Sequence, residues 1–396
     1  MRRLMLVAAV VASIAVAGIL TTWIAGTGVA MASTTVPAQG IFENCPLDTA
    51  LMTCLQRLEV MHRGGIKVVV IPANGASLRS LASYAAFAHA LGMSVMWELS
   101  NASWWQDPMT STSLQATFGA MASACGCSEN GAILSYTIRW LSHLAGTYGY
   151  YAADDSMLGP GDQAGVAAYV ALIKERDPRH TVMISANQQS QIDEYQATAD
   201  LIGTEIYPVT TTSLMPVTSN ATMWGDVAQT AIDAQRSADG AGKPSAFILQ
   251  AFTWGDNLGD GTAIGYCSPQ DTTATCYAKL RYPSAGEQLQ LRNEVLEHAQ
   301  AKLILWWSFP GTYGQVGSDT NTVYPTGAEA ASRWSGLVSA IKAPWPPQAT
   351  HARRRLSTRA ARARAARAAR AARAARAARA ARTARAARAA HAARAA

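Results

Sequence analysis

The sequence lacks the short motifs that identify several large classes of enzyme. It has no Walker phosphate-binding loop, no HExxH zinc motif and no G-x-S-x-G nucleophile turn. The nearest approach to a glycine-rich dinucleotide turn is Gly259-Asp-Gly261 with Gly265, which lies far along the chain and not after the first expected strand. We interpret it as an ordinary turn, so none of these sites is indicated.

Acidic residues are absent from the last 46 residues. The net charge of the whole chain therefore does not represent the charge of its main part. Residues 351–396 hold 15 arginines, and Arg2 and Arg3 add two near the start. The formal net charge is +7, but residues 33–350 contain only 16 of the 33 basic residues and all 26 acidic ones. This body of the chain is therefore acidic, which argues against a globally basic nucleic-acid-binding domain.

Long apolar runs are missing except near the N-terminus. Residues 4–24 are mostly apolar and follow Arg2 and Arg3, and Ala30-Met31-Ala32 has small residues at the spacing that signal peptidase recognises. We predict that residues 1–32 are a signal peptide. An uncleaved N-terminal anchor is the alternative, because the run approaches the roughly 20 residues that span a bilayer. Both interpretations predict export: the protein is secreted or extracellular, or is anchored to the membrane with its body outside the cytosol.

Cysteine is scarce, and its even count of six fits disulfide formation outside the cytosol. Two close pairs are expected to bridge: Cys45 with Cys54, and Cys267 with Cys276. Cys125 and Cys127 are left open, because a bridge across a single residue is strained. The histidines are scattered through expected helices and their edges, so we expect no metal site and no cofactor: His62, His89, His143, His180 and His298.

Short β-branched or aromatic runs alternate with longer helical patterns between Gly40 and Pro344. Eight runs are expected to form strands: 40–44, 67–72, 94–99, 149–153, 181–185, 201–207, 246–252 and 302–308. The clearest helical patterns are 77–91, 133–147, 163–176, 226–238, 285–301 and 328–341. Strict alternation predicts parallel strands, and eight such units predict an α/β fold, a (β/α)8 TIM barrel, over residues 33–345. An open doubly wound sheet is the alternative.

Polar and aromatic residues gather at the C-terminal ends of the expected strands, where barrels of this type carry their chemistry. In chain order they are Glu43, Asn74, Trp97, Glu98, Asp154, Asp155, Asn187, Glu205, Tyr207, Gln250, Trp254, Trp306 and Trp307. A polar loop adds Trp104 and Trp105. We expect this set to converge on one mouth of the barrel and to bind substrate there.

Carboxylates and indoles that lie together at one end of a barrel are typical of a sugar-binding site. Pyranose rings stack their apolar C–H faces on indoles, and cleavage of a glycosidic bond needs two carboxyl groups, one protonated and one ionised. Asp155 and Glu205 are the expected catalytic pair, because they follow different strands and can lie on either side of a substrate. Asp154 is the third catalytic candidate, since a neighbouring carboxylate raises the pKa of an acid.

Structural interpretations of the same residues remain open. Asp154 and Asp155 could cap the helix that follows them, and Glu205 could be the buried partner of an arginine. Adjacent strand residues point to opposite sides, so only one of Trp306 and Trp307 is expected to face the mouth.

An ordered series of segments resembles the secreted glycoside-hydrolase-like TIM barrels. The segments are Gly149-Tyr-Tyr-Ala-Ala-Asp-Asp-Ser156, Asp177-Pro178, residues 199–208 ending in Tyr-Pro, Gly242-Lys-Pro244, Leu249-Gln-Ala-Phe-Thr-Trp254 and Leu305-Trp-Trp-Ser308. The resemblance covers about residues 40–342. It implies that Asp155 matches the acid at the end of the fourth strand, although this chain has Asp-Asp-Ser where the family pattern is similar to Asp-Glu-Pro.

A second departure lies at the end of the seventh strand. Many retaining barrel glycosidases that resemble this chain have a nucleophilic Glu there, whereas this chain has Gln250. An amide cannot form the glycosyl ester, so three options remain. Glu205 or Glu98 is the second carboxylate, an N-acetyl group of the sugar is an internal nucleophile, or the barrel binds glycan without cleaving it.

Residues 346–396 are expected to form a proline-containing linker and a low-complexity tail rich in Ala and Arg. A three-residue Arg period produces no apolar face on a helix, so the tail cannot build a core and is expected to be a solvated polycation. It could contact an anionic cell-wall polymer, lipid headgroups or nucleic acid, or it could be a repeat expansion without a partner.

Taken together, these features lead us to expect a monomeric exported glycoside hydrolase acting on a polysaccharide or oligosaccharide. The alternative is a non-catalytic glycan-binding barrel tethered by its tail to an anionic surface.

Overall fold

The computed structural model describes residues 36–100, 113–155, 158, 162–209, 220–254, 280–310 and 325–345. Val36 belongs to a separate N-terminal unit, and every other described residue belongs to the unit that begins at Pro37. The expected signal peptide and the arginine tail lie outside the described residues, so both stay predictions.

Eight parallel strands form a closed barrel in sequence order, with β8 pairing back onto β1. The strands are β1 (Ala38–Phe42), β2 (Val68–Pro72), β3 (Ser94–Glu98), β4 (Thr147–Ala153), β5 (Thr181–Ala186), β6 (Leu201–Ile206), β7 (Ser245–Gln250) and β8 (Ala301–Trp307). All eight predicted strands are present, with ends displaced by at most two residues. The predicted (β/α)8 TIM barrel is confirmed, and the doubly wound sheet is excluded because the sheet closes.

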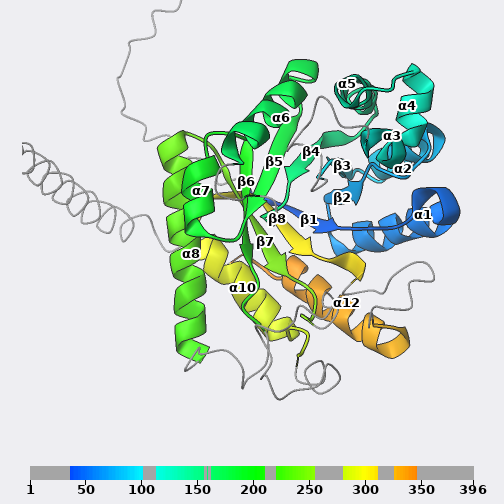
Figure 1. Ribbon diagram of the computed structural model, residues 1–396. Helices are drawn as coiled ribbons and strands as arrows, with labels where there is room; N and C mark the ends of the chain where they lie inside the picture. The colour runs from blue at the N-terminus through cyan, green and yellow to red at the C-terminus, as the bar shows by residue number, and fades with distance from the viewer. Residues whose placement is uncertain are drawn as a thin grey trace, which may run out of the picture. The chain divides into compact units, whose positions relative to one another are not determined.

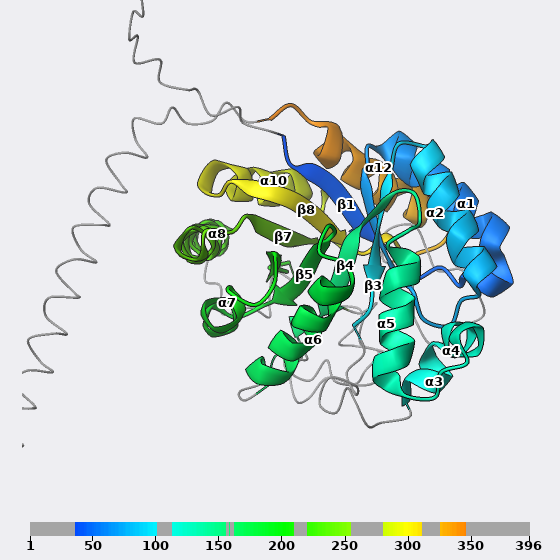
Figure 2. The same cartoon turned by 90° about the horizontal axis from the view of Figure 1, so that it is seen from above.

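Helices surround the strands (Figures 1 and 2). They are α1 (Leu47–Gly64), α2 (Leu78–Ala90), α3 (Ser113–Thr117), α4 (Gly119–Cys125), α5 (Asn130–Leu141), α6 (Gln163–Arg176), α7 (Gln189–Tyr195), α8 (Asn220–Ala241), α10 (Ala285–His298) and α12 (Gly327–Lys342). Serine side chains begin two of them: Ser77 accepts a hydrogen bond from the Ser80 amide, and Ser284 forms a capping box with Glu287. None of the described helices is long and apolar enough to cross a membrane.

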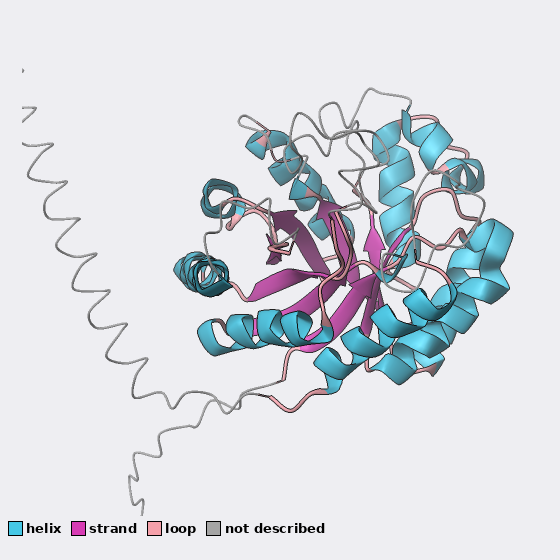
Figure 3. Cartoon of the chain, turned by 90° about the horizontal axis from the view of Figure 1, so that it is seen from below, coloured by secondary structure: helices cyan, strands magenta, loops and turns pink. Residues whose placement is uncertain are grey.

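Strand residues alternate between two apolar layers. One set, which includes Val70, Met96 and Ile248, fills the inside of the barrel. The other, which includes Val69, Val95 and Leu249, packs between the strands and the surrounding helices, where Figure 3 shows the helices enclosing the sheet. Because successive strand residues point to opposite faces, the face of a residue at a strand end follows from its position relative to these layers.

The fourth strand breaks this alternation just before its C-terminal end. The pairing of β4 with β5 shifts register between Tyr151 and Ala153. Tyr151 lies in the inner layer, whereas Ala152 and Ala153 both lie in the outer one. Such an extra residue re-aims the side chains that follow it. Asp154 therefore turns back toward Tyr151, although regular alternation would put residues three apart on opposite faces.

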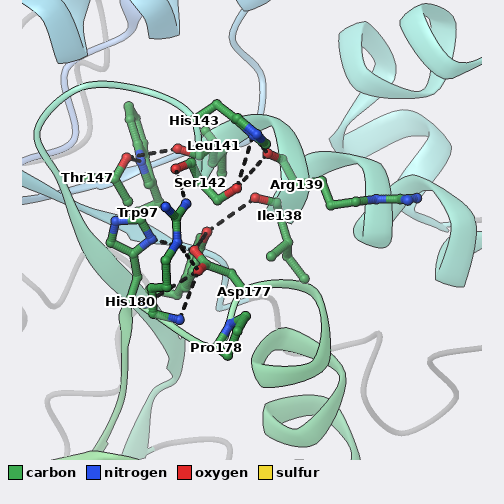
Figure 4. A network of polar contacts seen from close by, with 12 residues as sticks. Trp97, Ile138, Arg139, Leu141, Ser142, His143, Thr147, Asp177, Pro178 and His180 are labelled. Atoms are coloured by element: carbon green, nitrogen blue, oxygen red, sulfur yellow. Dashed lines mark hydrogen bonds and ion pairs between the residues drawn. The ribbon is translucent and has the colours of Figure 1, made fainter.

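A polar network lies at the opposite, N-terminal end of β4 and β5 (Figure 4). The buried Asp177 accepts a hydrogen bond from the Tyr150 hydroxyl at 2.8 Å and contacts His180 Nδ1 at 2.5 Å. Burial alone would raise the pKa of Asp177, but hydrogen bonds from His180 and Tyr150 outweigh it and lower the pKa below its usual range. The network joins the end of α6 to the barrel, and this end of a TIM barrel contributes stability rather than chemistry.

Gly149 is needed where β4 runs close to β5. A Cβ at this position would lie 2.0 Å from the Thr181 carbonyl oxygen, which belongs to the backbone and cannot rotate away. We expect Gly149→Ala to lower the free energy of unfolding by about 1–3 kcal/mol, measured by urea denaturation. Gly225→Ala in α8 is the control, because nothing lies within 4 Å of its Cβ position. It should leave stability unchanged or raise it by up to about 1 kcal/mol, and an equal loss in both variants would contradict the argument.

Two disulfides are present among the described residues. The predicted Cys45–Cys54 bridge is confirmed, and it joins the segment after β1 to Cys54, about two turns into α1. Cys125 and Cys127, which sequence spacing left open, are also bonded to each other. Cys267 and Cys276 lie outside the described residues.

Candidate active site

Three carboxyl groups meet at the C-terminal ends of β4 and β6. Asp154, Asp155 and Glu205 each place one carboxylate oxygen within 4.8 Å of the others. Glu205 lies on β6, and its alternation with Ile206 of the outer layer directs it into the barrel. The two aspartates follow the irregular end of β4. The expected catalytic residues are therefore brought together.

Asp154 is held by two buried hydroxyl groups. The Tyr151 hydroxyl donates to Asp154 Oδ1 at 2.5 Å, and Ser185 Oγ on β5 donates to the same oxygen at 3.2 Å. The two hydroxyls also contact each other at 2.6 Å. Burial raises the pKa of Tyr151 well above its usual range, so the phenol keeps its proton and can donate it.

Asp155 is held from β5 and α7. Its backbone N–H donates to Ser185 Oγ at 3.1 Å, and Asn187 donates its side-chain amide to Asp155 Oδ2. Gln191 on α7 donates to the Asp155 carbonyl at 3.1 Å. The predicted site residue Asn187 therefore orients a second predicted site residue at the exposed rim of the mouth.

Two acids in this mouth favour their protonated forms. Burial and then the charges of Asp154 and Asp155 raise the pKa of Glu205 well above its usual range, although hydrogen bonds from Ser185 and Tyr207 act in the opposite direction. Burial, with a smaller contribution from the charge of Asp154, raises the pKa of Glu98 on β3 to about 7, against a lowering effect of the hydrogen bond from Ser100. The mouth can therefore hold protonated and ionised carboxyl groups side by side.

Aromatic side chains lie at the ends of β8 and after β6 and β7. Trp307 packs against Phe42 with ring centroids 4.6 Å apart, and it is only partly buried. Tyr207, which hydrogen-bonds Glu205, meets Phe252 and Trp254 with centroids 5.1 Å and 6.1 Å away. Trp307 ends β8, and Tyr207 and Trp254 follow β6 and β7, so all three lie on the C-terminal side of the strands. Their contact with substrate stays a prediction.

Glu43 was predicted to line the mouth, and this placement is wrong. Its carboxylate accepts hydrogen bonds from Arg57 Nε at 2.7 Å and Arg57 Nη2 at 3.1 Å, and the two side chains are 1% and 6% exposed. In β1, Ile41 faces outward and Phe42 inward, so Glu43 continues the outward set toward α1.

Trp97 and Trp306 were also predicted to bind substrate, but both are fully buried in the outer layer. Trp97 Nε1 donates to Thr147 Oγ1 at 3.1 Å, within the network of Figure 4. Trp306 Nε1 donates to Gln39 Oε1 at 3.0 Å. Alternation explains both errors, because their neighbours Glu98 and Trp307 take the inward positions. Of the Trp306–Trp307 pair only one faces the mouth, as predicted.

Gln250 cannot contact substrate in this arrangement, contrary to the prediction. It is 0% exposed, and its amide accepts from the Val209 N–H at 2.7 Å and donates to the Val209 carbonyl at 2.6 Å and the Phe252 carbonyl at 3.2 Å. Both amide protons are therefore used to fix the segment that follows β6 against the end of β7.

The other predicted site residues have less defined surroundings. Asn74 is exposed on the turn after β2, and its role stays a prediction. Trp104 lies outside the described residues.

Tyr151 and Ser185 contact the acids but were not predicted from the sequence, because hydroxyl groups inside apolar strands form no motif. No signal in the sequence identifies them, because the inner layer that they share with Met183 and Met96 is visible only in the folded barrel.

Two groups of side chains in the described residues could geometrically hold a metal ion: Asp154, Asp155 and Glu205 in the mouth, and Glu294, Glu297 and His298 on α10. The expectation of no metal site stays a prediction.

Comparison with known proteins finds no matching family model and no matching curated protein. Similar solved structures include glycoside hydrolases. An endo-β-1,4-mannanase from Thermotoga petrophila is 14% identical, with 77% of each chain covered and a TM-score of 0.45. A glycoside hydrolase family 5 mannosidase from Rhizomucor miehei is 12% identical, with 76% of this chain and 93% of that chain covered and a TM-score of 0.46.

An HpcH/HpaI aldolase from Desulfitobacterium hafniense DCB-2 is also similar, at 11% identity and a TM-score of 0.31, with 69% of this chain and 86% of that chain covered. All three TM-scores lie below 0.5, and the barrel is established by its own closed strand pairing.

Proposed function

We propose that the protein is an exported glycoside hydrolase that cleaves O-glycosidic bonds of a polysaccharide or oligosaccharide. The observation that carries the proposal is the meeting of Asp154, Asp155 and Glu205 within 4.8 Å in a mouth bordered by partly buried aromatic rings. Carboxyl groups of unequal proton affinity supply an acid and a nucleophile, and aromatic rings supply stacking surfaces for pyranose faces.

The electrostatics favour an exchange of roles relative to the sequence-based expectation. Glu205 is the acid, because its buried position beside two carboxylates keeps its proton bound. We assign Asp155, which accepts a hydrogen bond from the Asn187 amide at the exposed rim of the mouth, as the ionised partner. In the first step Glu205 gives its proton to the leaving oxygen while Asp155 attacks the anomeric carbon. In the second step Glu205 takes a proton from water, and that water releases the sugar from Asp155.

The separation of the carboxyl groups favours retention of the anomeric configuration. Retaining enzymes keep their two carboxyl groups about 5–5.5 Å apart, whereas inverting enzymes keep them about 6.5–9.5 Å apart to admit a water molecule. Oxygens of Asp155 and Glu205 lie within 4.8 Å of each other, which leaves little space for that water. We therefore propose a retaining reaction.

The alternative function is glycan binding without cleavage. One observation favours it: the end of β7 offers a fully bonded amide, Gln250, where the families that resemble this chain have a nucleophile. In this alternative the aromatic rings hold a glycan and the protonated acids only donate hydrogen bonds. For either function we propose a monomer whose arginine tail contacts an anionic wall polymer, lipid or nucleic acid.

The test is release of reducing ends from a panel of plant, fungal and bacterial wall polysaccharides by the full chain. We expect activity on at least one glycan, and a loss of at least about 100-fold in kcat/KM in both Glu205→Gln and Asp155→Asn. Asp226→Asn, an exposed aspartate on α8, is the matched control and should retain activity. Retention of an insoluble glycan without any cleavage, unchanged in Glu205→Gln, would favour the binding barrel.

A further inference from the structure

Asp154 differs from its neighbour Asp155 in what its carboxylate contacts. One oxygen, Oδ1, faces both the Tyr151 and the Ser185 hydroxyls at 2.5 Å and 3.2 Å. Ser185 is fully buried, and Tyr151 is 1% exposed. Asp155 instead meets an exposed amide, that of Asn187. Asp154 is therefore the aspartate whose carboxylate is held by buried hydroxyl groups.

We propose that Asp154 is a fixed negative charge that keeps the catalytic proton on Glu205, and that Tyr151 and Ser185 are positioning residues that hold Asp154 in its ionised form. This inference rests on the proposed function only in naming Glu205 as the acid. It assigns Asp154 no proton transfer of its own.

The count of hydroxyl protons supports this assignment. Tyr151 and Ser185 carry one proton each, and Ser185 already accepts the Asp155 N–H with one of its lone pairs. If Ser185 donates to Asp154, that carboxylate receives both protons directly. If Ser185 donates instead to Tyr151 or to Glu205, the Tyr151 proton still goes to Asp154. Hydrogen bonds to the charged form of a carboxyl favour that form.

The groups that face Glu205 come from three strands. Asp154, Asp155 and Tyr151 come from β4 and the residues after it, Ser185 from β5 and Tyr207 from the end of β6. Glu98 on β3 interacts with Asp154. An ionised Asp154 makes loss of the Glu205 proton costlier, because two like charges would then lie within 4.8 Å in a partly buried mouth. The fixed charge therefore extends to higher pH the range over which Glu205 stays protonated.

The test is a titration of the carboxyl carbons by NMR in the full chain without substrate, after ¹³C labelling of Glu and, separately, of Asp. Glu205→Gln assigns the Glu205 signal by its disappearance. We expect the midpoint of Glu205 to fall by about one pH unit or more in Asp154→Asn, which keeps the shape of the side chain but removes its charge. Asp226→Asn should leave the midpoint unchanged.

A second arm examines the two hydroxyls. In the wild type the last proton of the cluster should leave from a Glu signal. In Tyr151→Phe we expect part of that proton on the Asp154 signal at the same pH, because the carboxylate has lost a donor. In Ser185→Ala we expect a smaller transfer, because Asp154 and Glu205 both lose a donor. Ser185→Thr, which keeps a hydroxyl, should restore the wild-type pattern. A purely structural role for either hydroxyl would change stability without moving the proton.

Two results would overturn the inference: an unchanged Glu205 midpoint in Asp154→Asn, or a wild-type cluster whose last proton resides on Asp154. If Tyr151→Phe does not fold, Asp154→Asn still tests whether the charge of Asp154 holds the proton on Glu205. Because the titration uses no substrate, its failure is distinguishable from failure of the proposed function. If no polysaccharide is cleaved but the titration gives the expected result, the hydrolase proposal is wrong and the inference about Asp154 and Glu205 still holds.

Discussion

Replacing Arg57 with methionine is expected to lower the free energy of unfolding by about 3–5 kcal/mol. Arg57 and Glu43 form a bidentate ion pair between α1 and the end of β1, with side chains 6% and 1% exposed. The guanidinium also lies over the Phe309 ring, 4.5 Å from its centroid. Methionine fills much of the same volume but leaves the Glu43 carboxylate buried without its Arg57 partner, and the cost is mainly that of this unpaired charge.

The pH dependence and a double variant identify the cause. Without the cation a proton on Glu43 relieves the unpaired charge, so its folded-state affinity for a proton exceeds that of the unfolded chain. The deficit of Arg57→Met should therefore be smallest below about pH 4 and grow as the pH rises. Adding Glu43→Gln should recover more than half of the loss, since neutral groups are cheaper to bury. Urea denaturation at pH 4 and pH 8 measures both effects.

An exposed ion pair on the same helix is the control. Arg63 pairs with Glu59 at 3.6 Å, and their side chains are 68% and 46% exposed. Arg63→Met should cost less than about 0.5 kcal/mol. Similar losses in Arg63→Met and Arg57→Met would show that burial of the Glu43 charge is not the source of the effect.

The misassignment of Glu43 illustrates what the sequence can and cannot reveal in this fold. All eight strands were predictable because short β-branched runs alternate with helical patterns. The sequence does not predict which residues of each strand point into the barrel, because parallel strands packed on both sides show no alternation of polar and apolar residues. Glu43, Trp97 and Trp306 stand at strand ends like true site residues, but they point toward the helices.

The acid cluster was predictable in its members but not in its geometry. Asp154, Asp155 and Glu205 follow strands whose C-terminal ends meet in any TIM barrel, so their convergence follows from the fold. The register shift in β4 decides that Asp154 returns to the inner side beside Tyr151. Pairing irregularities of this kind depend on the neighbouring strand, here β5, and therefore leave no local signal in the sequence.

Gln250→Glu is expected to destabilise the protein and to create no new catalytic activity, although it introduces the acid that the resemblance to glycoside-hydrolase-like barrels implies at this strand end. The amide of Gln250 bonds to the backbone N–H and carbonyl of Val209 and to the carbonyl of Phe252. A carboxylate would keep the bond to the N–H but would turn an acceptor toward two buried carbonyl oxygens. We expect a loss of about 3 kcal/mol or more at neutral pH, from the lost hydrogen bonds and the buried charge.

The sign of the pH dependence follows from the same contacts. A protonated carboxyl can still donate to one of the two carbonyls, so folding would raise the pKa of the new acid above its unfolded value of about 4.3. A raised folded-state pKa contributes stability that is present below the unfolded pKa and is lost as the pH rises through the folded one. The loss in Gln250→Glu should therefore be smaller at pH 4 than at pH 8.

Gln56→Glu provides the matched control, because Gln56 is exposed on α1 and the substitution is chemically identical. Its effect should stay within about 0.5 kcal/mol at both pH values. Activity that rises in Gln250→Glu without loss of stability would mean that the side chain reaches the mouth, and it would contradict the role given to the amide. In the structure the amide holds the segment after β6 against the end of β7, so Gln250 has a structural role at this strand end.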